Sequence, residues 1–374
     1  MKNIGFTDIQ NLAHLESSYA QIDPFYSRDE ITTDLSVPWF YGKHELDCYR
    51  LDQMRCAVQN ARLKVGYPGT FKNAENLAYF RFRGQLPESL YFRASGRVAV
   101  SIDGTPVYES KNETELHAIT PTGNVNSVLL IEVYAENDLP ALYVENKELH
   151  PEWSDDLRHW SDAVIEYSDS EETPPHKMPV KVEKLKPESV KDGVYDFGRE
   201  VYGHVIIESK QAIYAGESLD EVRNCNEKHM EQSTDITKNK DGSWRSINPL
   251  AFRYVRTNGD AKLRAEIPVQ PFSYRGAFAC SDECLTRIWA HSSYTLKLCM
   301  QDFILDGVKR DRLPWVGDLA MSMMVNASVF GNEDIIRRTL NVLGRAGISK
   351  SHLNGIIDYS LWWIISHELY QQYF

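Results

Sequence analysis

The hydrophobic period of the sequence changes near residue 281, and this change limits the folds that the chain can adopt. Before it, from about residue 77, apolar and polar residues alternate in short runs that Gly, Pro and Asp interrupt, which is typical of antiparallel strands. After it, apolar residues recur at the spacing of one helix face. The predicted fold class is therefore multidomain β plus α, with two antiparallel β-sandwich modules followed by helices.

Shifts in composition divide the chain into five predicted segments. Residues 1–69 show little periodicity and form an N-terminal lead-in. Residues 70–150 form the first β-sandwich and residues 193–275 the second. The polar, Pro-rich stretch 151–192 between them is predicted as a linker, in which Trp153 and Trp160 could pack onto a neighbour. Residues 276–374 form the helical region.

Single residues mark the predicted turns and helix starts. Asp103-Gly104 predicts a two-residue hairpin turn. Ser281 and Asn332 are predicted as N-caps, and Pro314 as a first-turn residue of the second helix. A fourth helix begins in DYSLWWIISHELYQQYF.

Charge and cysteine content exclude several classes of partner. The net charge is −12, which disfavours nucleic acid and anionic membrane surfaces as partners. No run of about 18 apolar residues predicts a membrane span. The six cysteines are scattered without a CxxC pair, and the N-terminus lacks an apolar signal region, which favours a reducing, cytoplasmic location and no metal site. No cofactor is predicted.

The densest polar cluster is the stretch DGVKRDRLPWVGD, residues 306–318, on a predicted loop between two helices. It holds three carboxylates, three cations and a Trp, and functional residues concentrate on such loops. A carboxylic acid that is kept protonated can donate to a glycosidic oxygen, and an indole can cover an apolar sugar face. The alternative is an ion-pair network that stabilises the loop, with Asp318 as a favourable anion in a first helical turn.

These residues resemble the α-L-rhamnosidases of glycoside hydrolase family 78. DGVKRDRLPWVGD resembles the catalytic stretch of that family, and AFACSDECLTRIWAHSSYTL its first catalytic-domain helix. VYDFGREVYGHVIIE, AFRYVRTNG and DYSLWWIIS resemble strands of an accessory β domain and a later helix. The resemblance implies inverting hydrolysis of terminal α-L-rhamnosides in an (α/α)6 toroid that follows β-sandwiches.

The resemblance also implies roles for individual residues. Asp311 falls at the position of the general acid. Asp306 and Asp318 fall at positions that bind the sugar or tune the acid, and Arg310 and Trp315 line the same pocket. A later stretch brings Asp358, Trp362 and Trp363 to the pocket wall, where core packing is an equally good account of the two Trp.

Two departures from the family pattern qualify this prediction. The acid position holds Asp311 where the family usually has Glu, which shortens its reach by about 1.5 Å. The four predicted helices are fewer than a complete toroid contains, and no residue here matches the general base. We therefore expect a truncated chain that is inactive by itself, and activity from a longer parent.

Two further functions stay open at this point. The same scaffold could be a non-catalytic carbohydrate-binding protein. It could also be an assembly protein, because apolar helix faces such as that of Leu361, Ile364 and Ile365 need a partner, and the partner could be a second copy in a homo-oligomer. The expected small-molecule partner is a rhamnose-containing glycoside, and the sequence does not decide whether calcium binds.

Overall fold

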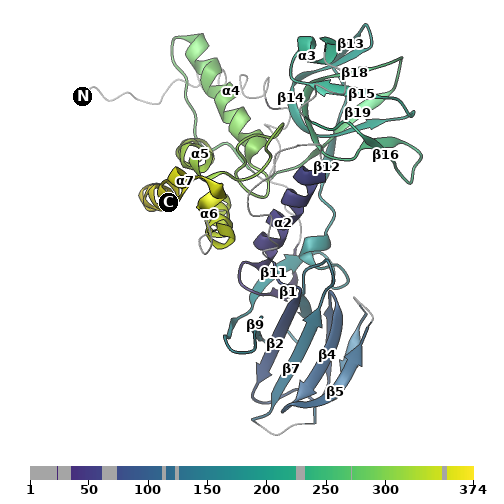
Figure 1. The fold of residues 1–374 in the computed structure, drawn as a ribbon, viewed down its shortest axis with the longest axis vertical. Coiled ribbons are helices and arrows are strands. Elements are labelled where there is room, and N and C mark those ends of the chain that lie inside the picture. The colour runs from purple at the N-terminus through teal and green to yellow at the C-terminus, as the bar shows by residue number, and fades with distance from the viewer. Residues whose placement is uncertain are drawn as a thin grey trace. The chain divides into compact units, whose positions relative to one another are not determined.

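The computed structural model of the chain describes residues 23, 35–60, 74–111, 115–122, 126–224, 232–270, 272–347 and 352–374. The chain divides into two compact units (Figure 1). The sandwich unit consists of residues 32–53 and 70–179. The large unit consists of residues 1–31, 54–69 and 180–374. Helix α2 (Glu45–Asn60) has residues in both.

The sandwich unit contains two antiparallel sheets around one apolar core, as predicted. The five-stranded sheet runs in the order β11 (Val164–Ser168), β1 (Val37–Tyr41), β8 (Leu142–Val144), β3 (Leu90–Ala94), β6 (His117–Ile119). The six-stranded sheet runs in the order β10 (Ser161–Asp162), β9 (Glu152–Ser154), β2 (Leu77–Arg83), β7 (Val128–Tyr134), β4 (Arg97–Ile102), β5 (Thr105–Ser110).

The alternating sequence pattern explains the core of this unit. In β2, Ala78, Phe80 and Phe82 point inward while their neighbours are less buried. Burial of each Phe side chain stabilises the fold by about 1.5–3 kcal/mol, so a strand that buries two of them contributes several kcal/mol. The predicted hairpin turn is confirmed, because Asp103 and Gly104 both have positive φ between β4 and β5.

The large unit begins with an antiparallel β module of eight strands. Strand β14 (Val194–Ile207) pairs within residues 194–203 with β13 (Ser189–Lys191) and β18 (Leu250–Thr257). Its last four residues pair with β19 (Leu263–Pro268) and β17 (Trp244–Ser246). The outer strands are β12 (Val182–Leu185), β15 (Ile213–Gly216) and β16 (Ile236–Lys238), and a short helix α3 (Leu219–Asn224) follows β15. Apolar residues from both halves of β14 share one core.

Residues 151–192, predicted as a linker, carry strands of both units. β9, β10 and β11 join the sandwich sheets, and β12 and β13 join the β module. These strands are two to five residues long, so their pairing with longer neighbours stabilises them where their charged, Pro-rich sequence alone does not. Trp153 is buried in the sandwich core, and the guanidinium of Arg81 lies 3.7 Å from the ring centroid of Trp160. The predicted lead-in likewise contains β1 and all of α2, and its residues 1–22, 24–34 and 61–69 lie outside the described residues.

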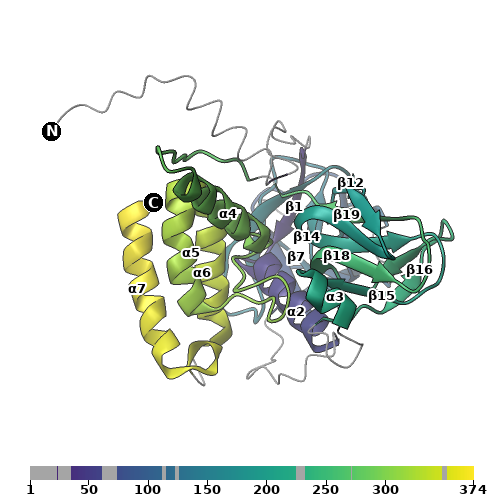
Figure 2. The same cartoon turned by 90° about the horizontal axis from the view of Figure 1, so that it is seen from above.

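Four helices follow the β module, as predicted: α4 (Glu283–Cys299), α5 (Val316–Val329), α6 (Glu333–Gly347) and α7 (Ile357–Tyr373). α5 packs against the other three around a shared apolar core (Figure 2). A 3₁₀ turn, Leu353–Gly355, precedes α7, and another, Pro175–Lys177, lies in the sandwich unit.

The predicted helix starts are confirmed in part. The side chain of Asn332 accepts from the backbone N–H of Ile335 at the start of α6, as an N-cap does. At α4 the N-cap is Asp282 and not Ser281, because the Asp282 carboxylate accepts from the N–H of Cys284. Pro314 lies two residues before α5, whose N-cap is Trp315.

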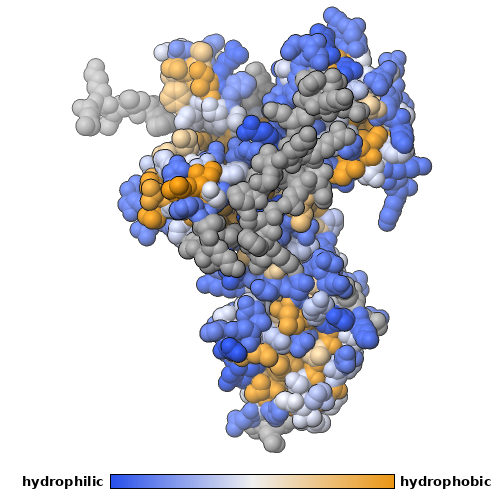
Figure 3. All heavy atoms as spheres, in the orientation of Figure 1, coloured by the Kyte–Doolittle hydropathy of each residue, from blue (hydrophilic) through white to orange (hydrophobic). Residues whose placement is uncertain are grey.

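Parts of the helical surface are apolar. On α7 the side chains of Ile357, Leu361, Ile364 and Ile365 are exposed, and on α4 so is that of Ile288. Orange areas over these helices in Figure 3 show this surface. Trp362 is half-buried against the shared helical core. In the parts of the chain that the structure describes, no helix is both long and apolar enough to cross a membrane.

Candidate active site

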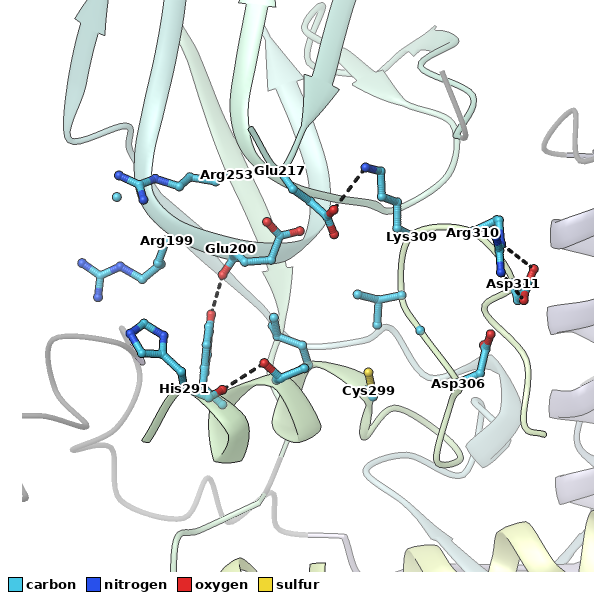
Figure 4. A pocket seen from close by; sticks show the side chains of 16 residues that line it. Arg199, Glu200, Glu217, Arg253, His291, Cys299, Asp306, Lys309, Arg310 and Asp311 are labelled. Atoms are coloured by element: carbon cyan, nitrogen blue, oxygen red, sulfur yellow. Dashed lines mark hydrogen bonds and ion pairs between the residues drawn. The ribbon is translucent and has the colours of Figure 1, made fainter. Parts of the chain in front are cut away.

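The loop between α4 and α5 carries the polar cluster and lines a cavity of about 690 Å³ in the large unit. This volume is within the range of small-molecule sites. Two backbone hydrogen bonds close the loop, from the N–H of Asp306 to the carbonyl of Leu313 (3.1 Å) and from the N–H of Arg312 to the carbonyl of Gly307 (3.0 Å). The rest of the lining comes from β14, β18, the segment after β15 and one face of α4 (Figure 4).

Arg312 fastens this loop to the β module. Its side chain is buried and donates to the backbone carbonyl of Pro249 (2.8 Å), to Oε1 of Gln232 (3.0 Å) and to the carbonyl of Lys309 (2.9 Å). Gln232 in turn exchanges hydrogen bonds with the backbone of Ala251 in β18. The φ of Arg312 is 55°, a strained value for a residue with a side chain, which these contacts maintain.

Asp311 is another carboxyl of the loop that lines the cavity. Its side chain is 20% exposed and pairs with the guanidinium of Arg310 through two contacts of 3.2 and 3.3 Å. Arg310 is 62% exposed, so water screens this ion pair. The ion pair orients the Asp311 carboxylate, and breaking the pair costs little free energy.

Asp306 is the more buried carboxyl of the loop. Burial raises its pKa to about 7, and a hydrogen bond with Asp311 acts in the same direction. Its Oδ1 atom is buried without a hydrogen-bond partner. Burial likewise raises the pKa of the neighbouring Cys299 thiol, to about 12, with Asp306 as the next cause. At neutral pH Asp306 is therefore present in both its protonated and its ionised form, beside the carboxyl group of Asp311.

Tyr359, at the start of α7, connects the loop with the last helix. Burial raises the pKa of its hydroxyl, and the carboxylates of Asp318, Asp358, Asp306 and Asp311 raise it further. Its ring packs edge-on against Trp315 at a centroid distance of 6.0 Å. A Cβ at position 317 would lie 3.1 Å from this ring, so Gly317 permits the close approach.

The predicted site residues are thus divided between the cavity and its surroundings. Asp306, Arg310 and Asp311 line the cavity. Asp318 is in the first turn of α5 and Asp358 in the first turn of α7, where both act on Tyr359. Trp315 contacts that same tyrosine, while Trp362 packs against the helical core. These last four are absent from the cavity lining, and their predicted roles stay predictions.

Sequence analysis did not single out the part of the cavity that the β module supplies. Arg199 and Glu200 of β14 and Arg253 of β18 line it, together with Glu217. Arg253 binds Asp196 (2.9 and 3.1 Å), and Lys309 of the loop binds Glu217 (3.2 Å) and Glu221 (2.8 Å). The only sequence signal was the charged pair in the DFGREVYG strand, which periodicity assigns to a strand and not to a site.

The start of α5 is held by a side chain from outside that helix, Asn354. The Asn354 side chain accepts from the N–H of Val316 (3.2 Å) and donates to the carbonyl of Pro314 (3.1 Å). This completes a helix end that Trp315 does not cap with its own side chain. Within the described ranges, no group of three or more His, Cys, Asp or Glu residues could hold a metal ion.

A family model matches part of this chain. Residues 273–363 match the bacterial α-L-rhamnosidase six-hairpin glycosidase domain. This match contains α4, the loop with Asp306 and Asp311, α5, α6 and the start of α7. No curated protein matches the sequence.

Solved α-L-rhamnosidase structures are similar at low identity. The enzyme from Dictyoglumus thermophilum has 15% identity and a TM-score of 0.41, over 91% of this chain and 48% of that one. A family 78 rhamnosidase of Bacillus sp. GL1 has 16% identity and a TM-score of 0.36, over 90% of this chain and 44% of that one. The Streptomyces avermitilis enzyme, solved with L-rhamnose, has 15% identity and a TM-score of 0.35, over 73% of this chain and 36% of that one. The chain spans less than half the length of each of these proteins.

Residues 273–363 are therefore similar to a glycoside hydrolase domain of the six-hairpin type. Within that class the segment is rhamnosidase-like, so the resemblance predicted from the loop motif is confirmed for residues 273–363.

Proposed function

We propose that the cavity binds the terminal sugar of an α-L-rhamnoside. We further propose that the cavity is part of the active site of an inverting glycoside hydrolase, with Asp311 as the proton donor. One observation carries the proposal: the segment that matches the rhamnosidase family contains the loop that lines a cavity of about 690 Å³. This cavity can hold a monosaccharide, which is smaller than the ligands of typical small-molecule sites.

The carboxyl pair supports acid catalysis. In the proposed step, Asp311 gives its proton to the glycosidic oxygen as the bond between that oxygen and the anomeric carbon breaks. Asp306 keeps its proton in a substantial fraction of molecules at neutral pH and hydrogen-bonds to Asp311, so it can supply a proton to the donor. The Arg310 contact has to open for this step, and an exposed ion pair opens at low cost.

Inversion also needs a base on the opposite face of the sugar, about 6.5–9.5 Å from the acid, to take a proton from the attacking water. The other carboxyl groups among the described lining residues are Glu200 and Glu217. Burial keeps Glu200 neutral at neutral pH, so it is not prepared to act as a base. Glu217 is held by Lys309, which is only 15% exposed, so this ion pair is less screened than that of Arg310 with Asp311 and opens less easily. We therefore expect residues 1–374 to bind the sugar without measurable turnover.

A non-catalytic sugar-binding protein is the second candidate. The pairing of Asp311 with Arg310 favours it, because a carboxylate held by a guanidinium is a poor proton donor. In this case Asp311 serves only to bind the ligand.

Hydrolysis of an aryl α-L-rhamnoside distinguishes the two candidates. The assay compares residues 1–374, any longer natural version of the chain, and the longer version with Asp311→Asn. The matched control is Asp334→Asn, at an exposed residue of α6. We expect turnover only in the longer version, a loss of more than about 100-fold with Asp311→Asn, and no loss with the control. Rapid hydrolysis by Asp311→Asn would contradict the catalytic role, and so would an inactive longer chain that still binds the sugar.

A further inference from the structure

The pairing of β14 with β18 has a bulge-like irregularity at two charged residues that line the cavity. The pairing register of β14 with β18 shifts between Asp196 and Val201, and Gly198 within this stretch has a φ of 76°. A Cβ at Gly198 would overlap the carboxylate of Glu188. Bulges of this kind change the direction of side chains and recur beside active sites. Arg199 and Glu200 lie within this irregular stretch, and both line the cavity.

The cations around this cavity are already paired. Arg199 pairs with Glu188 and Arg253 with Asp196, both within the β module. Lys309 and Arg310 pair with carboxylates as described above. Every Arg and Lys among the described lining residues therefore has an anionic partner, so an anionic ligand would have to displace one. An uncharged ligand fits this arrangement better.

Glu200 differs from these paired groups. Its backbone carbonyl accepts a hydrogen bond from the hydroxyl of Tyr294 on α4 (2.6 Å), which fixes the backbone of the bulge against the helix (Figure 4). Its side-chain Oε1 is buried and has no hydrogen-bond partner. A buried acceptor or donor without a partner costs about 1–3 kcal/mol, so such groups are rare unless a ligand or water completes them.

The protonation of Glu200 fits an uncharged, hydroxyl-rich ligand. Burial raises its pKa to about 8, and the carboxylates of Glu217 and Glu221 also raise it, while the cations Lys309 and Arg253 lower it. His291 and Tyr294 of α4 and Asp306 of the loop also line the same cavity. At neutral pH the carboxyl is therefore a donor through its hydroxyl and an acceptor through its carbonyl oxygen, which is the pairing that sugar hydroxyls offer.

We propose that Glu200 is a substrate-contacting residue of the cavity, and that its buried carboxyl exchanges hydrogen bonds with hydroxyl groups of the bound sugar. This inference rests on the proposed function and adds a determinant from the β module to a site otherwise attributed to the helical segment. Glu200 then contributes to sugar recognition, while the carboxyl pair of the α4–α5 loop is the part that reacts.

Titration calorimetry with L-rhamnose tests this proposal on the complete chain of residues 1–374. Glu200→Leu removes both hydrogen-bonding atoms, and Glu200→Gln keeps a donor and an acceptor but cannot ionise. Glu208→Gln is the control, because Glu208 directly follows β14 and is exposed. Circular dichroism and thermal melting confirm that each variant is folded, and the amide variant ensures a folded sample because it removes only an ionisable group.

At pH 7 we expect Glu200→Leu to weaken binding by at least about tenfold, Glu200→Gln by less than about threefold, and Glu208→Gln not at all. Between pH 7 and pH 9.5 the wild-type affinity should fall relative to that of Glu200→Gln, because only the wild type ionises at this position. Asp306 is present in both proteins, so the ratio of the two affinities reports only the effect of ionising Glu200.

The outcomes separate this inference from the proposed function. If the wild type binds L-rhamnose and both Glu200 variants bind it equally well at every pH, the inference is wrong and the proposed function stands. If the wild type does not bind L-rhamnose, the proposed function fails and the role of Glu200 fails with it.

Discussion

Two buried polar clusters, one in each unit, differ in how their hydrogen bonds are completed. In the sandwich unit, Nδ1 of His176 lies 2.9 Å from the hydroxyl of Tyr41, and Nε2 lies 3.0 Å from Oδ1 of Asp138. Lys177 and the N–H of Leu139 complete the contacts of Asp138. In the large unit, by contrast, Glu200 and Asp306 each leave one buried oxygen without a partner beside a cavity.

The comparison shows that a perturbed pKa does not by itself mark a functional site. Burial lowers the pKa of His176, and hydrogen bonds from His176 and Lys177 hold the pKa of Asp138 well below its usual range. The Asp–His–Tyr order resembles a catalytic relay, yet the His176 side chain has no exposed surface and all its partners are internal. Its groups are completed by the protein, whereas Glu200 and Asp306, which line the cavity, each have one buried oxygen that no protein group completes.

The largest expected effect is on the completed cluster. Asp138→Ala removes the charged acceptor that His176, Lys177 and the N–H of Leu139 share, so we expect the sandwich unit to lose about 3–5 kcal/mol of unfolding free energy. Urea denaturation followed by fluorescence measures this, because Trp39 and Trp153 are buried in that unit. The control His159→Ala, at an exposed ring, should leave the midpoint unchanged. If Asp138→Ala proves as stable as the wild type, the cluster has no structural role.

Substitution of Glu200 is expected to change the unfolding free energy in the opposite direction, so that the variant is more stable than the wild type at high pH. The pKa of Glu200 is raised from the ordinary 4.5 to about 8, so the unfolded chain ionises first and the native state loses stability as pH rises from about 4.5 to 8. Glu200→Gln abolishes this loss. We expect equal stability at pH 4 and a variant more stable by roughly 2–4 kcal/mol at pH 9. Thermal melts across this range measure the difference, and parallel curves for the two proteins would contradict the burial of this carboxyl.

A smaller effect is expected for the anchor of the loop. Arg312→Gln cannot reach all three acceptors, so we expect a loss of about 2 kcal/mol and a weaker affinity for L-rhamnose. Arg337→Gln, at an exposed arginine of α6, is the matched control. Denaturation and calorimetry on the same samples give both quantities. Unchanged sugar affinity in a destabilised Arg312→Gln would show that the loop does not depend on this anchor.

The smallest effect on stability is expected for Arg310→Ala. The exposed pair with Asp311 contributes less than about 1 kcal/mol, so the unfolding midpoint should barely move. If Asp311 is the acid, freeing it raises turnover in a longer active chain or leaves it unchanged. A loss of turnover would instead assign Arg310 to substrate binding.

Regular patterns were predictable from the sequence where packing alone determines them. The alternation in β2 and β7 and the helical spacing after residue 281 predicted the sandwich and the four helices, because one buried face imposes each period. The loop motif likewise predicted the region of Asp306 and Asp311. The strands within residues 151–192 were missed, because such short strands depend on distant partners for their stability.

Glu200, Arg312 and Tyr359 were missed for a related reason. Each acts through contacts with residues far away in the sequence: Glu200 through a bulge, Arg312 through Pro249 and Gln232, and Tyr359 through the ring contact that Gly317 permits. No local spacing signals such contacts. The motif therefore indicated where chemistry is concentrated but not the β-module wall opposite it.

A crystal structure of the chain with L-rhamnose tests the account most directly. The account predicts one sugar in the cavity between the α4–α5 loop and the bulge of β14, with hydroxyl groups within hydrogen-bond distance of Asp306 and Glu200 and the Asp311 carboxyl facing the anomeric centre. A cavity that stays free of sugar at saturating concentration, with Asp311 still held by Arg310 and the sugar bound elsewhere, would contradict it.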